Sequence, residues 1–311
     1  MKPALLIVLL FAALDVTDSG AKTIAFLGDE PYSITRFDVT ETGHLDVQTS
    51  GGHILVVGTD ERIARVEMHV RKNGRNLTKA DTDLSSYDIV IEKQGRTLLV
   101  KAERSARIVN IWDGSSSTSI SFTVYVPRGF TSNVRTSGGR IGIRNMTADQ
   151  VARTSGGSMT MENIRGVLDA RTSGGSITIN EVYGKLTAST SGGSIMANGM
   201  SGEIDLTTSG GSILIDNAMG RIHASTSGGS ISAKVSKVSE SLRLSTIGGS
   251  LNVTLPASQG FDIDARGSRV VSEMTRFNGS NGRGRMSGSV NGGGIPIRLT
   301  TSAGTVRIEY E

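Results

Sequence analysis

Residues 171–195 read RTSGGSITINEVYGKLTASTSGGSI and contain the hexapeptide TSGGSI twice, beginning at Thr172 and again at Thr190. The tetrapeptide TSGG keeps this 18-residue spacing without drift from Thr136 to Thr226. A variant copy, Thr246-Ile247-Gly248-Gly249, follows at a slightly longer interval. An isolated copy, Thr49-Ser50-Gly51-Gly52, precedes the series, and a related tetrapeptide, Thr301-Ser302-Ala303-Gly304, lies near the end of the sequence. A fixed period repeated this often predicts a repeat architecture.

The 18-residue units, numbered from their threonine as position 1, have apolar residues at positions 6, 8, 11, 15 and 17, with Gln150 at position 15 of the first unit as the exception. In the unit that starts at Thr172 these are Ile177, Ile179, Val182, Leu186 and Ala188. Alternation at 6 and 8, and again at 15 and 17, is typical of strands with one buried face. The Gly-Gly pair and the glycine at position 13 predict turns with positive φ. Each unit is therefore expected to form two short strands and two turns.

The fold predicted from this pattern is all-β, a single-chain β-solenoid (β-helix-like) with 18-residue, two-strand coils and irregular β caps. Stacked coils would place equivalent residues about 4.8 Å apart. A meander of antiparallel hairpins is the alternative, but an unvarying register over successive units favours stacked coils.

The chain divides into four expected segments. Residues 1–21 read as a signal peptide, because Met1-Lys2 is followed by a short apolar run from Ala4 to Leu14 and by small residues at 19–21. Residues 22–135 are expected to form an N-terminal β region and cap, 136–255 the regular solenoid, and 256–311 a C-terminal β cap. An uncleaved anchor or a buried strand is the alternative for the first segment. Export predicts a periplasmic, surface or extracellular location, with no membrane span after cleavage.

Composition excludes several classes of site. The chain has no cysteine, so it has no disulfide, thiolate metal site or cysteine nucleophile. Its net charge of +4 includes two basic segments, residues 62–75 and 266–285. These lack the interleaved aromatic residues that single-stranded nucleic acid requires. They could face an anionic glycan or lipid surface, and solvated surfaces explain them better.

Four stretches together resemble a known family: GHLDVQTSGGHILVVG, FTVYVPRGFTSNVRTSGGRI, the TSGGSI units and NGGGIPIRLTTSAGTVRIEY. Over roughly residues 35–311 the chain resembles the DUF4097 group of exported bacterial β-repeat proteins, often labelled adhesins. The resemblance implies an exported solenoid-like protein at the cell envelope, and it carries over no catalytic residue or ligand.

The repeat also aligns a ladder of hydroxyl side chains. The candidate ligand-binding residues are Thr172, Ser176, Thr190, Ser194 and Thr208. In one interpretation they form a polar strip that hydrogen-bonds an extended polymer such as a glycan. In the other they satisfy backbone groups of the turns.

Other chemistry has weaker support. Asp169 and Asp205 would lie about 9.6 Å apart, at the upper limit for an inverting glycosidase pair, but position 16 is simply an outward strand position. Calcium is not expected, because the turn carries no carboxylate. The four histidines show no metal-ligand spacing. We expect no catalytic residue, metal or cofactor.

The sequence thus predicts a non-enzymatic binding or adhesion module, with a polysaccharide or an envelope component as partner. The alternatives are a self-associating structural envelope protein and a polysaccharide-active β-helix enzyme.

Overall fold

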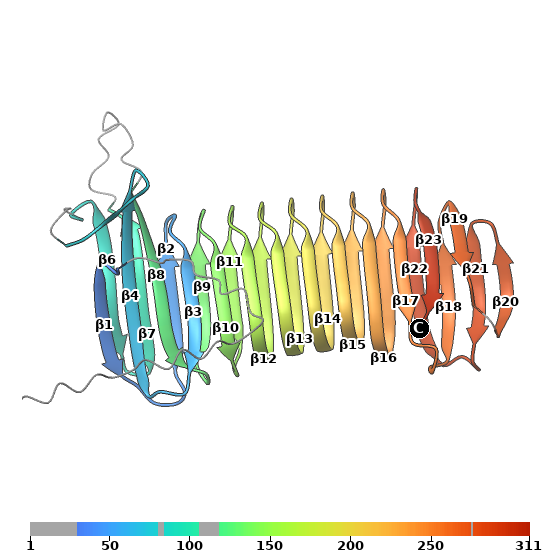
Figure 1. Ribbon diagram of the computed structural model, residues 1–311, viewed down its shortest axis with the longest axis horizontal. Coiled ribbons are helices and arrows are strands. Elements are labelled where there is room, and N and C mark those ends of the chain that lie inside the picture. Colours follow the sequence, from blue (N-terminus) through green and yellow to red (C-terminus); the bar gives the residue numbers. More distant parts are fainter. Residues whose placement is uncertain (1–29, 80–83, 106–117, 275) are drawn as a thin grey trace, which may run out of the picture.

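The computed structural model describes residues 30–79, 84–105, 118–274 and 276–311, and all regular structure in these ranges is β-strand. The strands wind into one long rod (Figure 1). The predicted all-β solenoid is therefore confirmed. The predicted signal peptide lies outside the described residues. Within the described ranges, no helix has the length and apolarity needed to cross a bilayer.

The middle of the rod consists of one strand per repeat. The strands are β12 (Met159–Thr172), β13 (Ile177–Thr190), β14 (Ile195–Thr208), β15 (Ile213–Thr226) and β16 (Ile231–Thr246). In the unit before them the strand is divided into β10 (Ile141–Met146) and β11 (Gln150–Thr154). From β12 to β15 each strand pairs in parallel with the next at a register of one repeat unit, so that Ile177 lies opposite Ile195. Parallel pairing rules out the hairpin meander, and each unit is one coil of the solenoid.

One of the two turns is a bend within a continuous strand. At position 10 the backbone is left-handed, with φ of 50° at Asn163 and 56° at Glu181. At position 13, Gly166 and Gly184 both have φ of 131°. The strand therefore turns a corner without losing its hydrogen bonds to the neighbouring coils.

The Gly-Gly pair serves a different purpose from the one expected. Neither Gly174 nor Gly175 has positive φ, so that part of the prediction is wrong. A Cβ on Gly175 would lie 2.0 Å from the carbonyl oxygen of Gly157 in the preceding coil, whereas a Cβ on Gly174 would meet nothing closer than 3.6 Å. The second glycine is required because the coils stack too closely for any side chain there. The first is tolerant, and Ala303 occupies its place in the last copy.

The core is a narrow apolar column inside the coils. Ile177, Ile179, Val182, Leu186 and Ala188 are all buried, as the alternation predicted. The largest buried side chains, Phe122, Phe130 and Phe261, lie in the segments that flank the regular repeats.

Coils at both ends stack out of sequence order. At the N-terminal end, one coil is formed by β2 (His44–Thr49) and β3 (Ile54–Thr59). On one side it stacks on the coil of β7 (Thr97–Arg104) and β8 (Thr118–Pro127), and on the other side on β9 (Thr131–Thr136) and β10 (Ile141–Met146). Both neighbours come later in the sequence. At the other end, the coil of β22 (Ile295–Thr301) and β23 (Thr305–Tyr310) lies between two earlier coils. One of these contains β16 and β17 (Leu251–Leu255), and the other contains β18 (Phe261–Arg266) and β19 (Arg269–Ser272). Coil geometry thus extends beyond residues 136–255 in both directions.

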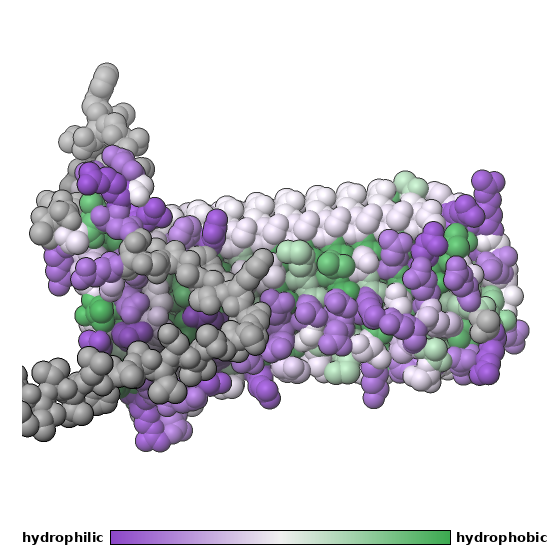
Figure 2. All heavy atoms as spheres, in the orientation of Figure 1, coloured by the Kyte–Doolittle hydropathy of each residue, from purple (hydrophilic) through white to green (hydrophobic). Residues whose placement is uncertain are grey.

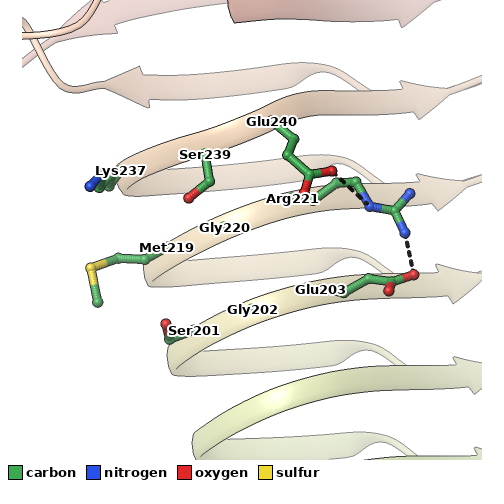
Figure 3. Close-up of a pocket in the computed structure, with 9 residues that line it drawn as sticks. All are labelled: Ser201, Gly202, Glu203, Met219, Gly220, Arg221, Lys237, Ser239 and Glu240. Carbon is green, nitrogen blue, oxygen red and sulfur yellow. Dashed lines mark hydrogen bonds and ion pairs between the residues drawn. The ribbon is translucent and has the colours of Figure 1, made fainter.

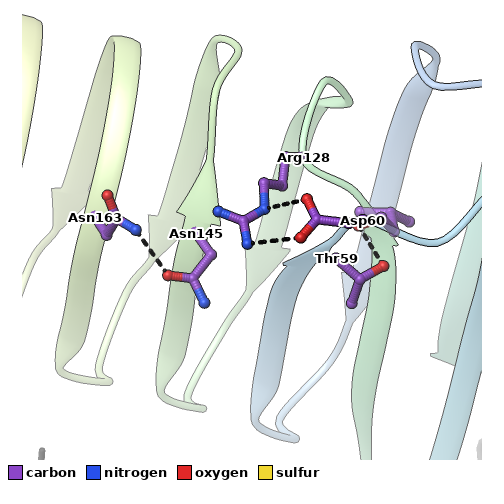
Figure 4. A network of polar contacts seen from close by, with 6 residues as sticks. Thr59, Asp60, Arg128, Asn145 and Asn163 are labelled. Carbon is purple, nitrogen blue, oxygen red and sulfur yellow. Dashed lines mark hydrogen bonds and ion pairs between the residues drawn. The ribbon is translucent and has the colours of Figure 1, made fainter.

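Antiparallel strands close the two ends. They are β1 (Ser33–Asp38), β4 (Ile63–Lys72), β5 (Arg75–Leu77) and β6 (Tyr87–Gln94) at one end, and β20 (Phe277–Gly282) and β21 (Arg285–Val290) at the other. Near the N-terminal end, the Arg128 Nε lies 2.8 Å from Asp60 Oδ1, and Asn163 donates a 2.9 Å hydrogen bond to Asn145 at the corner of the preceding coil (Figure 4).

Candidate functional site

The threonines of the predicted ligand ladder lie inside the solenoid. Thr172, Thr190 and Thr208 are 7%, 5% and 2% exposed. The Thr190 hydroxyl donates to the carbonyl of Gly175 in the preceding coil (2.8 Å) and accepts from the Gly193 N–H of its own turn (3.3 Å). The first threonine of every TSGG-type copy makes the same donation to the coil stacked before it: Thr49, Thr136, Thr154, Thr172, Thr190, Thr208, Thr226, Thr246 and Thr301.

The serines at position 5 lie nearer the surface. Ser176 and Ser194 are half-buried, and their hydroxyls accept 3.2 Å hydrogen bonds from the backbone N–H of the serine one coil further on. The hydroxyl ladder therefore joins coil to coil, as the second interpretation predicted. A surface strip that includes the threonines is wrong, because their side chains face the core.

The exposed part of the turns is small and uncharged. Ser173 and Gly174, at positions 2 and 3, are exposed, and the equivalent residues form a pale ridge along one edge of the rod (Figure 2). Positions 2 and 3 carry no charge, and Ile247 of the variant copy, 61% exposed, is the large apolar side chain among them. Along the regular copies the ridge therefore offers a partner little beyond serine hydroxyls.

The two carboxylates considered for catalysis are not brought together. Asp169 is bound by two guanidinium groups, Arg153 at 3.1 Å and Arg171 at 2.7 Å. The hydrogen bond from Arg171 to Asp169, with their charge attraction, raises the pKa of Arg171. Asp205 lies two coils away, with Thr187 between them in the register. Asp169 is thus held in a surface ion-pair cluster.

The histidines are dispersed over the molecule. His44 Nδ1 lies 2.8 Å from the Thr131 hydroxyl, and His53 Nδ1 accepts a 2.9 Å hydrogen bond from the Arg140 N–H. Burial, and then the positive charges of Arg140 and Arg71, lower the pKa of His53. Among the described residues, no group of three or more histidines and carboxylates could hold a metal ion.

A groove of about 720 Å³ runs across three coils at the corner of positions 12 to 14. We call it the glycine groove. It is lined by Ser201, Gly202 and Glu203 of β14, Met219, Gly220 and Arg221 of β15, and Lys237, Ser239 and Glu240 of β16. Gly202 and Gly220 form its floor, with Met219 and Lys237 on one side and Glu203 and Arg221 on the other (Figure 3).

The floor needs glycine for the same reason as the turns. A Cβ on Gly220 would lie 1.9 Å from the carbonyl oxygen of Gly202, and both residues have the φ that favours glycine. Side chains therefore stand only on the two sides, and the backbone is left open between them. The direction of the groove follows the rod, because its members occupy matching positions in successive coils.

One side of the groove carries a ladder of alternating charge. Glu203 accepts a hydrogen bond from Arg221 and lies 3.4 Å from Lys185. Arg221 also lies 3.8 Å from Glu240. These residues are partly exposed, so the pairs organise the surface more than they stabilise the fold.

The groove ends where the period changes. β16 belongs to the longer coil that runs from Thr226 to the variant copy at Thr246, and its pairing with β15 shifts register at Ala218 and again at Gly220. Val238 takes the place of the floor glycine and is buried. The Gln259 side chain binds the backbone of Val238 through two hydrogen bonds. Its Oε1 accepts one from the Val238 N–H (2.8 Å), and its Nε2 donates one to the Val238 carbonyl (2.9 Å). The longer interval after Thr226 marks in the sequence where the groove ends, but it does not indicate which residues line it.

The family model "Toastrack DUF4097" matches residues 42–309 of the chain. The chain belongs to the DUF4097 family. The resemblance stated from the sequence is therefore confirmed, and the matched range includes the out-of-order coils at both ends of this Toastrack chain except Tyr310, the last residue of β23. No curated protein sequence matches it.

Two solved structures are similar to this Toastrack chain at low identity. A "putative adhesin" from Bacteroides fragilis NCTC 9343 is 13% identical, with a TM-score of 0.41, and the match covers 90% of this chain and 96% of that one. A "putative cell adhesion protein" from Clostridium sporogenes ATCC 15579 is 10% identical, with a TM-score of 0.21, and the match covers 91% of this chain and all of that one.

Proposed function

We propose that this protein is an exported, non-enzymatic binding module that holds an extended envelope or extracellular polymer along the side of its rod. The observation that carries the proposal is the glycine groove, which crosses three successive coils at matching positions. A site that runs along a repeat axis suits a long ligand, because such a ligand meets equivalent positions at each step. A compact substrate would need its contacts to converge at one point.

Export is supported by the charged start, short apolar run and small residues of the first 21 positions. We expect the mature chain to begin at Lys22 and to be found outside the cytoplasm. Cell fractionation followed by N-terminal sequencing checks this, and an intact Met1 on cytoplasmic protein would count against export.

Binding is tested by incubating the purified protein with labelled polysaccharides, including envelope glycans of the source organism. Both the retained fraction and the polymer length are recorded. The proposal predicts retention of polymer of unchanged length. Shortened polymer would overturn the non-enzymatic assignment, and the Asp169→Asn and Asp205→Asn variants would then test whether those carboxylates are responsible. If no polymer is retained or shortened, binding along the groove loses its support.

A second candidate, self-association into an envelope structure, is favoured by β20. Within the described residues this strand pairs only with β21, and Phe277–Gly282 contains no charged residue or proline to protect its outer edge. Uncovered edges of this kind pair readily with other strands. Sedimentation velocity over a range of concentrations should then show oligomers in wild type and fewer in Ser280→Lys, whereas the mid-rod variant Ser232→Lys should behave as wild type. A monomer at all concentrations would dismiss this candidate.

A further inference from the structure

The glycine groove also indicates the chemistry of its ligand. Resting on the proposed function, we infer that the groove binds an uncharged glycan chain, and that the Glu203–Arg221–Glu240 cluster recognises its hydroxyl groups. The inference rests on the charge of the groove, on the direction in which it crosses the strands and on the hydrogen-bonding groups it presents.

The four charged side chains that line the groove sum to zero. Arg221 and Lys237 are balanced by Glu203 and Glu240, and Arg221 lies within ion-pair distance of both carboxylates. A polyanion such as nucleic acid or a sulfated glycan needs uncompensated positive charge along its path. A balanced groove instead favours a neutral polymer.

The groove runs across the strands. The floor of the groove is formed by β14 and β15, which are already paired with neighbouring strands on both edges. Gly202, for example, lies between Gly184 and Gly220 in the register. A peptide laid along the groove would cross these strands at a steep angle and could not add to the sheet, which is how extended peptides gain main-chain hydrogen bonds. A ligand in the groove therefore gains no strand pairing, and its hydrogen bonds must come from the side chains that line the groove.

The side chains on offer suit hydroxyl groups. A guanidinium presents five N–H donors and a carboxylate about four acceptor positions, so Arg221 and Glu203, which line the groove as a pair, retain unused donors and acceptors. Ser201 and Ser239 add hydroxyls that both donate and accept. Glu240, at 3.8 Å from Arg221 and with its side chain 74% exposed, is loosely held and can turn to a ligand.

The glycine floor and Met219 complete the site. Without Cβ atoms between the two sides, a flat ring can approach the backbone. The Met219 side chain, 40% exposed at the edge of this floor, supplies a flexible apolar surface for the C–H face of a sugar ring. One face of the ligand would thus contact apolar atoms and backbone, and its edge would contact the charged cluster.

The test compares binding of neutral and anionic polysaccharides by wild type, Ser239→Trp and Ser232→Trp. Both serines are exposed on β16, but only Ser239 lines the groove. Wild type should bind a neutral glycan, Ser239→Trp should bind it at least about tenfold more weakly, and Ser232→Trp should match wild type. Circular dichroism and thermal unfolding confirm that both variants fold.

Two outcomes separate this inference from the proposed function. If polymers bind but Ser239→Trp leaves binding unchanged, the groove inference fails and the binding module stands. If anionic polymers alone bind and Lys237→Gln abolishes their binding, the groove is a site but its ligand is not neutral, and the inference is again overturned. If no polymer or envelope fraction binds, the proposed function fails as well.

Discussion

The two glycines of a turn should respond in opposite ways to the same substitution. Gly193→Ala places a Cβ 2.1 Å from the Gly175 carbonyl oxygen, whereas Gly192→Ala places one no closer than 3.5 Å to any atom. An ordinary contact requires about 3.5 Å, so Gly193→Ala must open the stack by roughly 1.4 Å out of a spacing of about 4.8 Å.

The size of the effect follows from what this opening disturbs. Overpacking costs about 1–3 kcal/mol, and weakening the 2.8 Å hydrogen bond from Thr190 to the Gly175 carbonyl adds about 1 kcal/mol. We expect Gly193→Ala to lower the free energy of unfolding by roughly 3 kcal/mol. Gly192→Ala should raise it by about 0.4–1 kcal/mol, because alanine restricts the unfolded chain without a clash.

Urea unfolding of wild type and both variants, followed by circular dichroism, measures the difference. Gly192→Ala is the matched control, since it adds the same methyl group one residue away. Equal stability of the two variants would refute the argument that coil spacing, rather than backbone conformation, demands the second glycine.

Three further predictions concern single side chains. Thr190→Val removes the buried hydroxyl that pairs with the Gly175 carbonyl and the Gly193 N–H, so urea unfolding should show a loss of about 1–3 kcal/mol in the free energy of unfolding. Thr187→Val on the outer face is the control, and an equal effect of both variants would show that the hydroxyl ladder contributes nothing. Asp169→Asn breaks two ion pairs of partly exposed side chains, so thermal unfolding should show a loss below about 1 kcal/mol, and a larger loss would mean that the cluster supports the fold. Burial raises the pKa of Tyr310 to about 12. The unfolded chain therefore loses this proton at a lower pH than the folded chain, and the free energy of unfolding falls as the pH rises from about 10 towards 12. Tyr310→Phe should show a shallower fall of the urea midpoint over that range, and identical slopes would contradict the assigned cause.

The repeat allowed the regular part of the fold to be predicted from the sequence. A constant spacing of the TSGG copies leaves one register in which every coil buries its apolar positions, so the core of residues such as Ile177 and Leu186 followed directly. The ends could not be predicted in the same way. The copies at Thr49 and Thr301 show that coils exist there, but the coils they stack against are set by contacts between segments far apart in the chain.

The candidate site shows where pattern reasoning was insufficient. Thr190 follows Leu186 and Ala188 at intervals of two, so the alternation already placed it on the buried face, while its polar character suggested the surface. The glycine groove depends on positions 12 and 14, where the residue type changes from coil to coil: Ser201, Met219 and Lys237 on one side, Glu203 and Arg221 on the other. Positions without a repeated residue type gave no signal until the structure placed them side by side.

Oxidative footprinting of two methionines tests the central claim most directly. Met219 borders the groove and is 40% exposed, and Met196 lies outside the groove and is 45% exposed, so the free protein should oxidise at both. With a saturating neutral glycan, the account predicts slower oxidation at Met219 and an unchanged rate at Met196, read by mass spectrometry. If the glycan is bound and Met219 oxidises at its original rate, the polymer lies elsewhere on the rod and the groove is not its site.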